Sequence, residues 1–458
     1  MRYKPILTGQ HCTTTALTDC QLQIADRSPM LSGIIHCNPY IVIPLNRFIL
    51  LVLIVLTTGC ASTVEPPPPT SVDLPKTRTD PAKSAAVPAP TKPAASSALP
   101  PPAVLSEAQT SEFILQILPG NLKDKEGWAE DMQNVFHALH VQPSAENYCA
   151  VVAIIEQESS FQADPFVPGL PAIVMREIEQ RREKYSIPPT VVSWMLSATS
   201  SNGRSYQQRI DTLKTEKELS DLIEEIIAQI PAGKKMFPNT NPIRTGGPMQ
   251  VSIGFAEAHA KVRHYPYPVH GNLRNEVFSR RGGLYFGTAI LLDYPAPYHQ
   301  LIYRFADYNA GRYSSRNAAF QLALAKISGR KLATDGDLLR YQQGRPAAAS
   351  STTQLALSNI GKALQMSDAE INRDLQLEKL STFSQSHLYQ RVFALAGQTA
   401  PQPREAIPQI NLNSPKFQRK LTTEWFANRV NKRFADCLKR GASSNNKSTK
   451  KSKPPTRH

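Results

Sequence analysis

The sequence predicts a mainly α-helical protein that is preceded by a long segment without a core of its own. Over residues 104–439, apolar side chains recur mostly at helical spacing, and the two-residue alternation of half-buried strands is scarce. Residues 148–155 (Tyr-Cys-Ala-Val-Val-Ala-Ile-Ile) are apolar nearly all round. A helix with this pattern is normally buried in the middle of a domain, so we expect it at the centre of the fold.

The first 60 residues are interpreted as a leader that ends in a lipoprotein signal peptide. The apolar run 48–56 is too short to span a bilayer, which takes about 20 residues, but it has the length of a signal-peptide core. The following Thr57-Thr58-Gly59-Cys60 resembles a bacterial lipoprotein processing site, at which Cys60 would be lipidated. An ordinary secretory signal or an N-terminal membrane anchor are the alternatives. Since signal peptides rarely begin with so long a mixed leader, we expect a start near Leu45 and a misassigned start codon for residues 1–44.

This interpretation predicts where the protein lies and how its cysteines behave. Ala61 follows the lipidated position in place of an aspartate that would favour the inner membrane, so the resemblance implies the outer membrane, facing the periplasm. Cys149 and Cys437 remain in the mature chain. An oxidising periplasm permits a disulfide between them, but the apolar surroundings of Cys149 favour a buried free thiol, which we expect.

Two segments have compositions that cannot form a core. Residues 61–103 are rich in Pro, Ala, Ser, Thr and Lys, which predicts an extended linker that suits a tether between membrane and cell wall. Residues 441–458 are rich in Ser, Asn, Lys and Pro, which predicts a basic disordered tail.

The net charge of +15 gathers near the C-terminus, where residues 416–458 carry 13 Lys and Arg. An exported protein does not meet nucleic acid, so peptidoglycan carboxylates or lipid and lipopolysaccharide phosphates fit better as partners. A tail that only aids solubility is the alternative.

Two helix starts are marked clearly. Ser144 can cap the apolar helix, with Glu146 in its first turn. Thr215 and Glu218 form a capping-box pattern before a second amphipathic helix that stops at Pro231. Further helices are expected within 367–396 and 414–439.

Three short motifs follow one another along this helical framework. They are Glu158-Ser159 at the end of the apolar helix, Gly246-Gly247-Pro248-Met249-Gln250, and Tyr308-Asn309-Ala310-Gly311. Together they resemble the lytic transglycosylase branch of the lysozyme-like proteins, over residues 144–161 and 246–320. The resemblance implies a lysozyme-like helical domain over 104–345 with a large helical insertion at 165–243, and a helical C-terminal extension over 346–440. The rest of the chain has a general likeness to an uncharacterised family of bacterial envelope lipoproteins.

By this resemblance, the protein would cleave the MurNAc–GlcNAc bonds of peptidoglycan and form a 1,6-anhydro ring. Glu158, which precedes the serine of the motif, would be the acid and then the base. A carboxyl group can donate a proton at neutral pH only if its pKa is raised, and an apolar helix end with an unfavourable dipole predicts such a shift. Glu156 points about 200° away round the helix and cannot share that face.

The same resemblance assigns the other site residues. Tyr308 would orient the catalytic glutamate, and the substrate-binding residues would be Ser159, Met249, Gln250, Asn309 and Gly311. Pro248 departs from the Gly-Leu-Met-Gln turn of the family, because proline removes an N–H donor.

Alternatives remain open at this point. Asp164 or Asp307 as a second carboxylate would permit a hydrolase, and a non-catalytic peptidoglycan-binding scaffold lipoprotein would keep the same fold. His137 and His140 lack further ligands at metal-binding spacing, and the sequence has no Gly-rich phosphate loop, so neither a metal nor a cofactor is expected.

Overall fold

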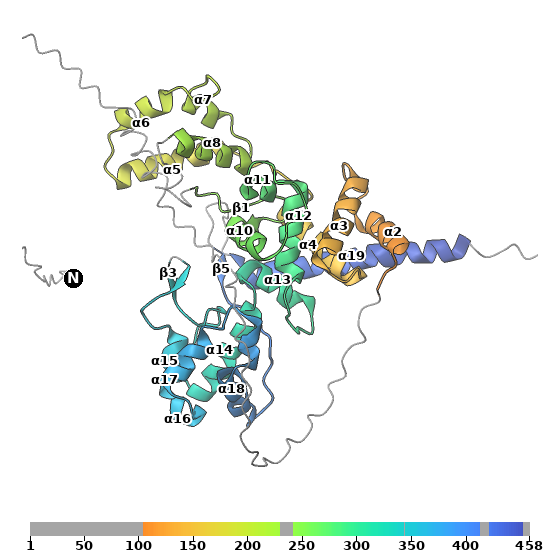
Figure 1. The fold of residues 1–458 in the computed structure, drawn as a ribbon, viewed down its shortest axis with the longest axis vertical. Coiled ribbons are helices and arrows are strands. Elements are labelled where there is room, and N and C mark those ends of the chain that lie inside the picture. The colour runs from red at the N-terminus through yellow and green to blue at the C-terminus, as the bar shows by residue number, and fades with distance from the viewer. Residues whose placement is uncertain (1–103, 230–240, 343, 413–420, 452–458) are drawn as a thin grey trace, which may run out of the picture. The chain divides into compact units, whose positions relative to one another are not determined.

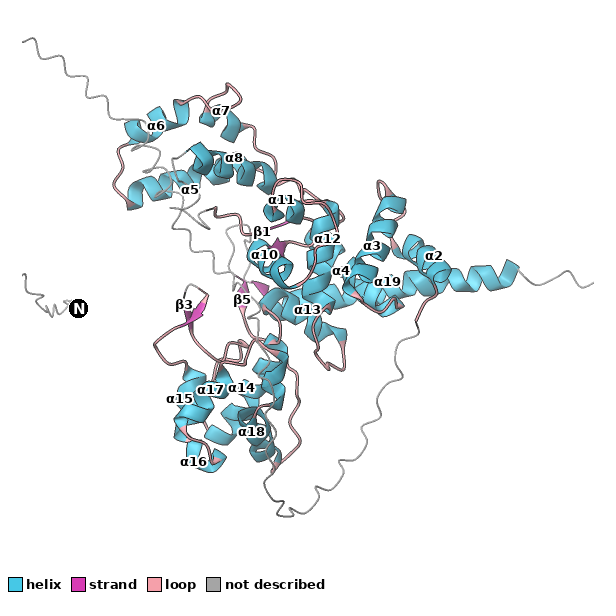
Figure 2. Ribbon diagram, viewed as in Figure 1, coloured by secondary structure: helices cyan, strands magenta, loops and turns pink. Residues whose placement is uncertain are grey.

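The computed structural model describes residues 104–229, 241–342, 344–412 and 421–451, which are mainly α-helical, as the sequence predicts (Figures 1 and 2). The predicted leader with Cys60 and the predicted linker 61–103 lie outside the described residues. None of the helices in the described ranges has the length and apolarity needed to cross a membrane.

The first hydrophobic core is built around α4 (Ala145–Glu158), whose residues 148–155 are all buried, as predicted. The predicted cap is also present, because the Asn147 N–H donates to Ser144 Oγ at 3.2 Å. The other helices that contribute to this core are α2 (Glu107–Ile117), α3 (Lys125–Leu139), α10 (Ile253–Val262), α11 (Leu273–Phe278), α12 (Arg280–Leu292), α13 (Leu301–Ala310) and α19 (Thr423–Lys451).

The predicted insertion is helical and has a small core of its own. It contains α5 (Leu170–Lys184), α6 (Pro189–Ser197), α7 (Tyr206–Asp211) and α8 (Glu216–Gln229). The predicted capping box is confirmed: the Glu218 N–H donates to Thr215 Oγ1 at 3.2 Å, and the Thr215 N–H donates to Glu218 Oε2 at 3.3 Å. Thr215 also forms a β-bridge with Phe166, so the first residues of the insertion lie beside the start of α8.

A second hydrophobic core follows the last motif. It packs α14 (Ser314–Ser328) with the helices that come after it, namely α15 (Thr352–Asn359), α16 (Gly361–Leu364), α17 (Asp368–Leu375), the 3₁₀ helix η1 (Ser381–Gln385) and α18 (His387–Gly397). The two cores therefore divide before the predicted boundary at 345/346, and the C-terminal α19 belongs to the first core.

The strands in the described ranges form three short antiparallel pairs. These are β1 (Thr245–Gly246) with β2 (Val251–Ser252), β3 (Tyr341–Gln342) with β4 (Arg345–Pro346), and β5 (Asn411–Leu412) with β6 (Leu421–Thr422). The first pair is part of the candidate site, because β1 and β2 flank the glycine-rich motif.

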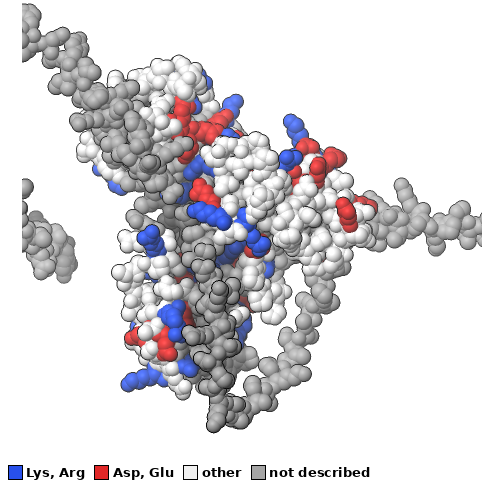
Figure 3. Space-filling model, viewed as in Figure 1, with Lys and Arg blue, Asp and Glu red and all other residues white. Residues whose placement is uncertain are grey.

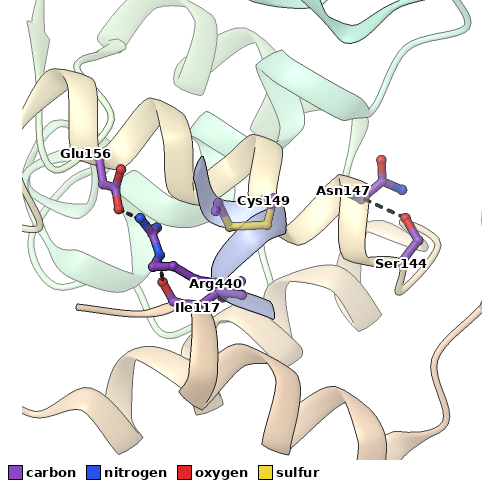
Figure 4. The surroundings of a disulfide bond; sticks show 7 residues. Ile117, Ser144, Asn147, Cys149, Glu156 and Arg440 are labelled. Carbon is purple, nitrogen blue, oxygen red and sulfur yellow. Dashed lines mark hydrogen bonds and ion pairs between the residues drawn. A yellow bond between two sulfur atoms is a disulfide. The ribbon is translucent and has the colours of Figure 1, made fainter. Parts of the chain in front are cut away.

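α19 lies along α4 and α13 and is joined to α4 by a disulfide between Cys149 and Cys437 (Figures 1 and 4). The expected free thiol at Cys149 is therefore wrong. Cys437 is buried on the apolar stripe of α19 with Phe426 and Val430, and this stripe covers α4. The apolar surroundings of Cys149 are thus supplied in part by the helix that carries its partner.

The predicted disordered tail is wrong as far as Lys451, because α19 continues to that residue. Gly441 does not end the helix but allows close packing, since a Cβ atom there would lie 2.3 Å from the Phe113 ring. Residues 452–458 lie outside the described part.

On the face drawn in Figure 3, acidic and basic side chains are interspersed.

Candidate functional site

The helix that carries Glu158 ends in an unusual turn. Ser160 and Phe161 both have left-handed backbone conformations, with φ of 51° and 67°. Such conformations are uncommon for residues other than glycine and persist only where the surroundings hold them. The Phe161 side chain is buried and meets the Trp128 ring edge-on at 5.1 Å. Packing of this side chain therefore fixes the chain direction immediately after Glu158.

The glycine-rich motif forms the tight turn between β1 and β2. Gly247 has φ +74°, and a Cβ atom there would lie 2.0 Å from the Val277 carbonyl oxygen, so only glycine fits. Pro248 is accommodated by Gly283 of α12, where a Cβ atom would come within 2.4 Å of the proline ring. Pro248 lacks an N–H, but its carbonyl is used, since Ser159 Oγ donates to it at 2.8 Å.

Tyr308 binds the next carbonyl of the same turn. Its hydroxyl donates to the Met249 carbonyl oxygen at 2.7 Å. Burial, reinforced by the negative charge of Glu158, raises the pKa of the Tyr308 phenol well above its usual range. A phenol with its pKa raised in this way stays protonated at neutral pH and so remains a hydrogen-bond donor to the turn.

The predicted motifs are therefore in direct contact. Ser159 and Tyr308 donate hydrogen bonds to successive carbonyl groups, those of Pro248 and Met249. The structure thus gathers residues that are far apart in the sequence around the end of α4. The arrangement can position one carboxyl group, that of Glu158, beside a rigid turn and a tyrosine.

The two side chains at the end of the turn differ in accessibility. Met249 is fully buried, and a Cβ atom at Gly287 would lie 2.4 Å from its sulfur, so the side chain fills the core. The predicted contact of this side chain with substrate does not fit that burial. Gln250 is only partly buried, with φ of 51°, and its Oε1 accepts from Thr245 Oγ1 at 3.3 Å. Within the described residues, its amide nitrogen donates no hydrogen bond, so it remains suited to bind a polar ligand.

Asn309 and Gly311 connect the third motif to the rest of the fold. Asn309 Oδ1 accepts from the hydroxyl of Thr423, the first residue of α19, at 2.8 Å. Gly311 ends α13 with φ of 106°, and its N–H donates to the Asp307 carbonyl at 2.7 Å. Asn309 therefore braces α13 against the C-terminal helix, and Gly311 turns the chain.

Asp307 is a structural carboxylate. It is buried and accepts hydrogen bonds from the hydroxyls of Tyr294 at 3.0 Å and Tyr298 at 2.7 Å. It also accepts from the main-chain N–H groups of Tyr313 and Ser315. Burial raises its pKa, and these bonds oppose that shift. Four donors occupy the carboxylate, which leaves it unsuited to activate a water molecule.

Asp164 lies outside this network, at the base of the insertion. Its carboxylate accepts from Thr215 Oγ1 at 2.9 Å, beside the β-bridge between Phe166 and Thr215. Burial raises the pKa of Asp164, and the hydrogen bond from Thr215 opposes the shift. The hydrogen bond of Asp164 therefore ties the segment after α4 to the start of α8.

The sequence did not indicate the part that α19 takes in the site. Gln157, next to Glu158, accepts at Oε1 from Arg429 Nε at 3.0 Å and from Arg433 Nε at 3.2 Å. Glu156 forms an ion pair with Arg440 at 2.7 Å (Figure 4). The four-residue spacing of Arg429 and Arg433 was the available signal, but it cannot reveal which distant helix these side chains meet.

The part of the chain that the structure describes contains no cluster of three or more His, Cys, Asp or Glu side chains arranged for a metal ion. His137 lies in the last turn of α3, and His140 caps that helix in a left-handed conformation. The groups that the structure gathers near the end of α4 are the Glu158 carboxyl, the Ser159 and Tyr308 hydroxyls and the Gln250 amide.

Comparison with known proteins places the chain in a family. A region covering residues 121–440 matches the family described as "Protein of unknown function (DUF1615)". The chain is also similar to "Uncharacterized protein YaiW" of Escherichia coli (strain K12), with 48% identity over 331 residues, which are 72% of this chain and 89% of that protein. No solved structure matches significantly. The chain therefore belongs to the DUF1615 family.

Proposed function

We propose that this protein is a peptidoglycan lytic transglycosylase, a member of the lysozyme-like superfamily that cleaves MurNAc–GlcNAc bonds with 1,6-anhydro ring formation. The observation that carries the proposal is the pair of hydrogen bonds from Ser159 and Tyr308 to the Pro248 and Met249 carbonyls. This pair joins the three motifs whose order suggested the reaction. It also leaves Glu158 at the end of a buried helix.

In the proposed reaction, Glu158 first donates its proton to the glycosidic oxygen, and the bond between C1 and that oxygen breaks. The carboxylate then accepts the proton of the C6 hydroxyl of the same sugar, whose oxygen forms a bond to C1. The glutamate is thereby regenerated, and no water is consumed. Tyr308 would fix the position of the turn relative to the carboxylate. Gln250 would bind the glycan through its amide.

The test is mass spectrometry of the soluble products from sacculi digested with the purified, disulfide-bonded chain. Anhydro-sugar products are expected from the wild type and are expected to disappear with Glu158→Gln. The matched control is Glu146→Gln, which removes a carboxylate from the first turn of the same helix and should retain activity. Products with reducing-end sugars would indicate a hydrolase and would contradict the transglycosylase.

A second candidate is a non-catalytic peptidoglycan-binding scaffold. It is favoured because two of the predicted substrate-binding residues have structural contacts. Met249 is buried in the core, and Asn309 accepts a hydrogen bond from Thr423. In that case the wild type would bind sacculi and release no fragments, and Glu158→Gln would bind equally well.

We also propose that Cys60 is lipidated and anchors the protein to the outer membrane, facing the periplasm. Cys60 lies outside the described residues, so this proposal depends on the processing-site resemblance alone. Mass spectrometry of the mature N-terminus is the test. An unmodified N-terminus at any other residue would contradict the anchor.

A further inference from the structure

Two guanidinium groups converge beside the proposed catalytic glutamate. Arg429 and Arg433, one turn apart on α19, both donate their Nε–H to the same oxygen, Oε1 of Gln157. This acceptor is neutral, and it belongs to the residue immediately before Glu158. The shared bond therefore holds two positive charges close together at the end of α4.

These two charges have no carboxylate partner among the described residues. The neighbouring Glu156 is already paired with Arg440. Neither Arg429 nor Arg433 forms an ion pair within the described ranges. Like charges held together repel, and an anion bound between them removes that repulsion. Each guanidinium also keeps its two terminal nitrogens, which are arranged as a fork that suits a carboxylate.

Arg429 is exposed and Arg433 is partly buried, and their helix is connected to the third motif. The Arg429 side chain is exposed and lies over the Trp425 ring, with 5.4 Å from its central carbon to the ring centroid. Trp425 is itself 37% exposed. Thr423, at the start of the same helix, bonds to Asn309. An exposed aromatic ring, a forked cation pair and the proposed acid are thus brought to one region by a single helix.

We propose that Arg429 and Arg433 bind a carboxylate of the peptide stems that the glycan carries, so that the enzyme prefers stem-bearing strands. This inference rests on the proposed function and specifies its substrate. The arginine pair would act as a specificity determinant that does not take part in bond cleavage, and Trp425 would present an apolar face to the sugar or peptide.

The test compares two substrates: sacculi, and glycan strands from which an amidase has removed the stems. The Arg429→Gln/Arg433→Gln variant is expected to raise KM for stem-bearing glycan about 10-fold or more, since one lost charge-assisted contact corresponds to about that factor. Its kcat should stay within about threefold, and its KM for stem-free strands should change much less than its KM for stem-bearing glycan. Equal changes on both substrates, or no change on either, would overturn the proposal.

The control is Lys432→Gln/Lys439→Gln, which removes the same charge from exposed positions of the same helix. It should behave like the wild type, and a comparable rise in KM would show that overall charge is responsible. Thermal unfolding of both variants checks that α19 remains packed.

Binding separates this inference from the proposed reaction. If the wild type releases no products, cosedimentation with intact sacculi replaces turnover, and the stem-free glycan strands are added as a soluble competitor that should not displace the protein. Loss of binding to intact sacculi by the arginine variant, with Glu158→Gln unaffected, would support the carboxylate receptor even though the proposed reaction had failed. If the variant instead lost binding only to phosphatidylglycerol vesicles, the site would be one for lipid phosphate, and the stem proposal would be wrong.

Discussion

Cys149 and Cys437 are 288 positions apart in the chain, yet they are joined by a disulfide, and both side chains are fully buried. The bond attaches α19 to the helix that ends at Glu158. Disulfides persist mainly in oxidising compartments, so this one is consistent with the export that the signal-like segment before Cys60 suggests.

Removal of this disulfide should destabilise the protein. Closure of so long a loop restricts the unfolded chain, so Cys149→Ala/Cys437→Ala is expected to lower the free energy of unfolding by about 3–5 kcal/mol. Urea unfolding measures the change. A reducing agent should have the same effect on the wild type and none on the variant. A loss below about 1 kcal/mol would show that α19 is held by packing alone.

Tyr308→Phe should weaken the turn that it supports. The variant leaves the Met249 carbonyl without its donor, which costs about 1–2 kcal/mol of stability. If the proposed reaction is correct, kcat on sacculi should also fall, by about 10-fold or more. The control is Tyr206→Phe, which removes an exposed hydrogen bond to Gln229 and should change the stability by less than about 0.5 kcal/mol. Equal effects of the two variants would contradict the role of Tyr308.

Gly247→Ala should lower the free energy of unfolding far more than an alanine at another glycine with positive φ. The added Cβ would meet the Val277 carbonyl at 2.0 Å, whereas at Gly329, with φ +64°, nothing lies within 4 Å. Gly329→Ala should therefore cost only about 1 kcal/mol for its backbone conformation, and Gly247→Ala about 3 kcal/mol or more. Denaturant unfolding of both variants gives the comparison, and similar losses would mean that the turn can move away from α11.

Protonation of His259 should lower the free energy of unfolding at acidic pH. Burial, with the positive charges of Arg312 and Arg263, lowers the pKa of His259 from 6.5 to about 4. Between these values the unfolded chain binds a proton that the folded protein excludes. Stability from this group is therefore complete above about pH 6.5 and is lost progressively as the pH falls towards about 4, by roughly 3 kcal/mol in total.

The comparison for His259 is His259→Gln, which does not titrate. Urea unfolding at about pH 7.5 and about pH 4 should show a smaller acid-induced loss in the variant than in the wild type, by up to about 3 kcal/mol. Parallel losses in the two proteins would assign the acid sensitivity to carboxylates instead.

The local features were predictable because they depend on neighbours in the sequence. The cap at Ser144 and the capping box at Thr215 and Glu218 are confirmed, since a side chain and a main-chain group three residues apart suffice to form them. The burial of residues 148–155 was equally predictable, because a helix that is apolar on every face has no side to expose to water. The helical character of the insertion follows from the same periodicity.

The sequence by itself thus determined the mainly helical class, the central helix and the order of the three motifs. Only the tertiary structure decided that Ser159 and Tyr308 hold successive carbonyls, that Asp307 is saturated by four donors, and that Cys437 reaches Cys149. Caps and periodicity arise from interactions over three or four residues, which a linear pattern displays directly. The two carbonyl contacts join residues 89 and 59 positions apart, and the disulfide joins residues 288 positions apart. Such contacts depend on which helices and loops pack together, and burial over the whole core determines that packing.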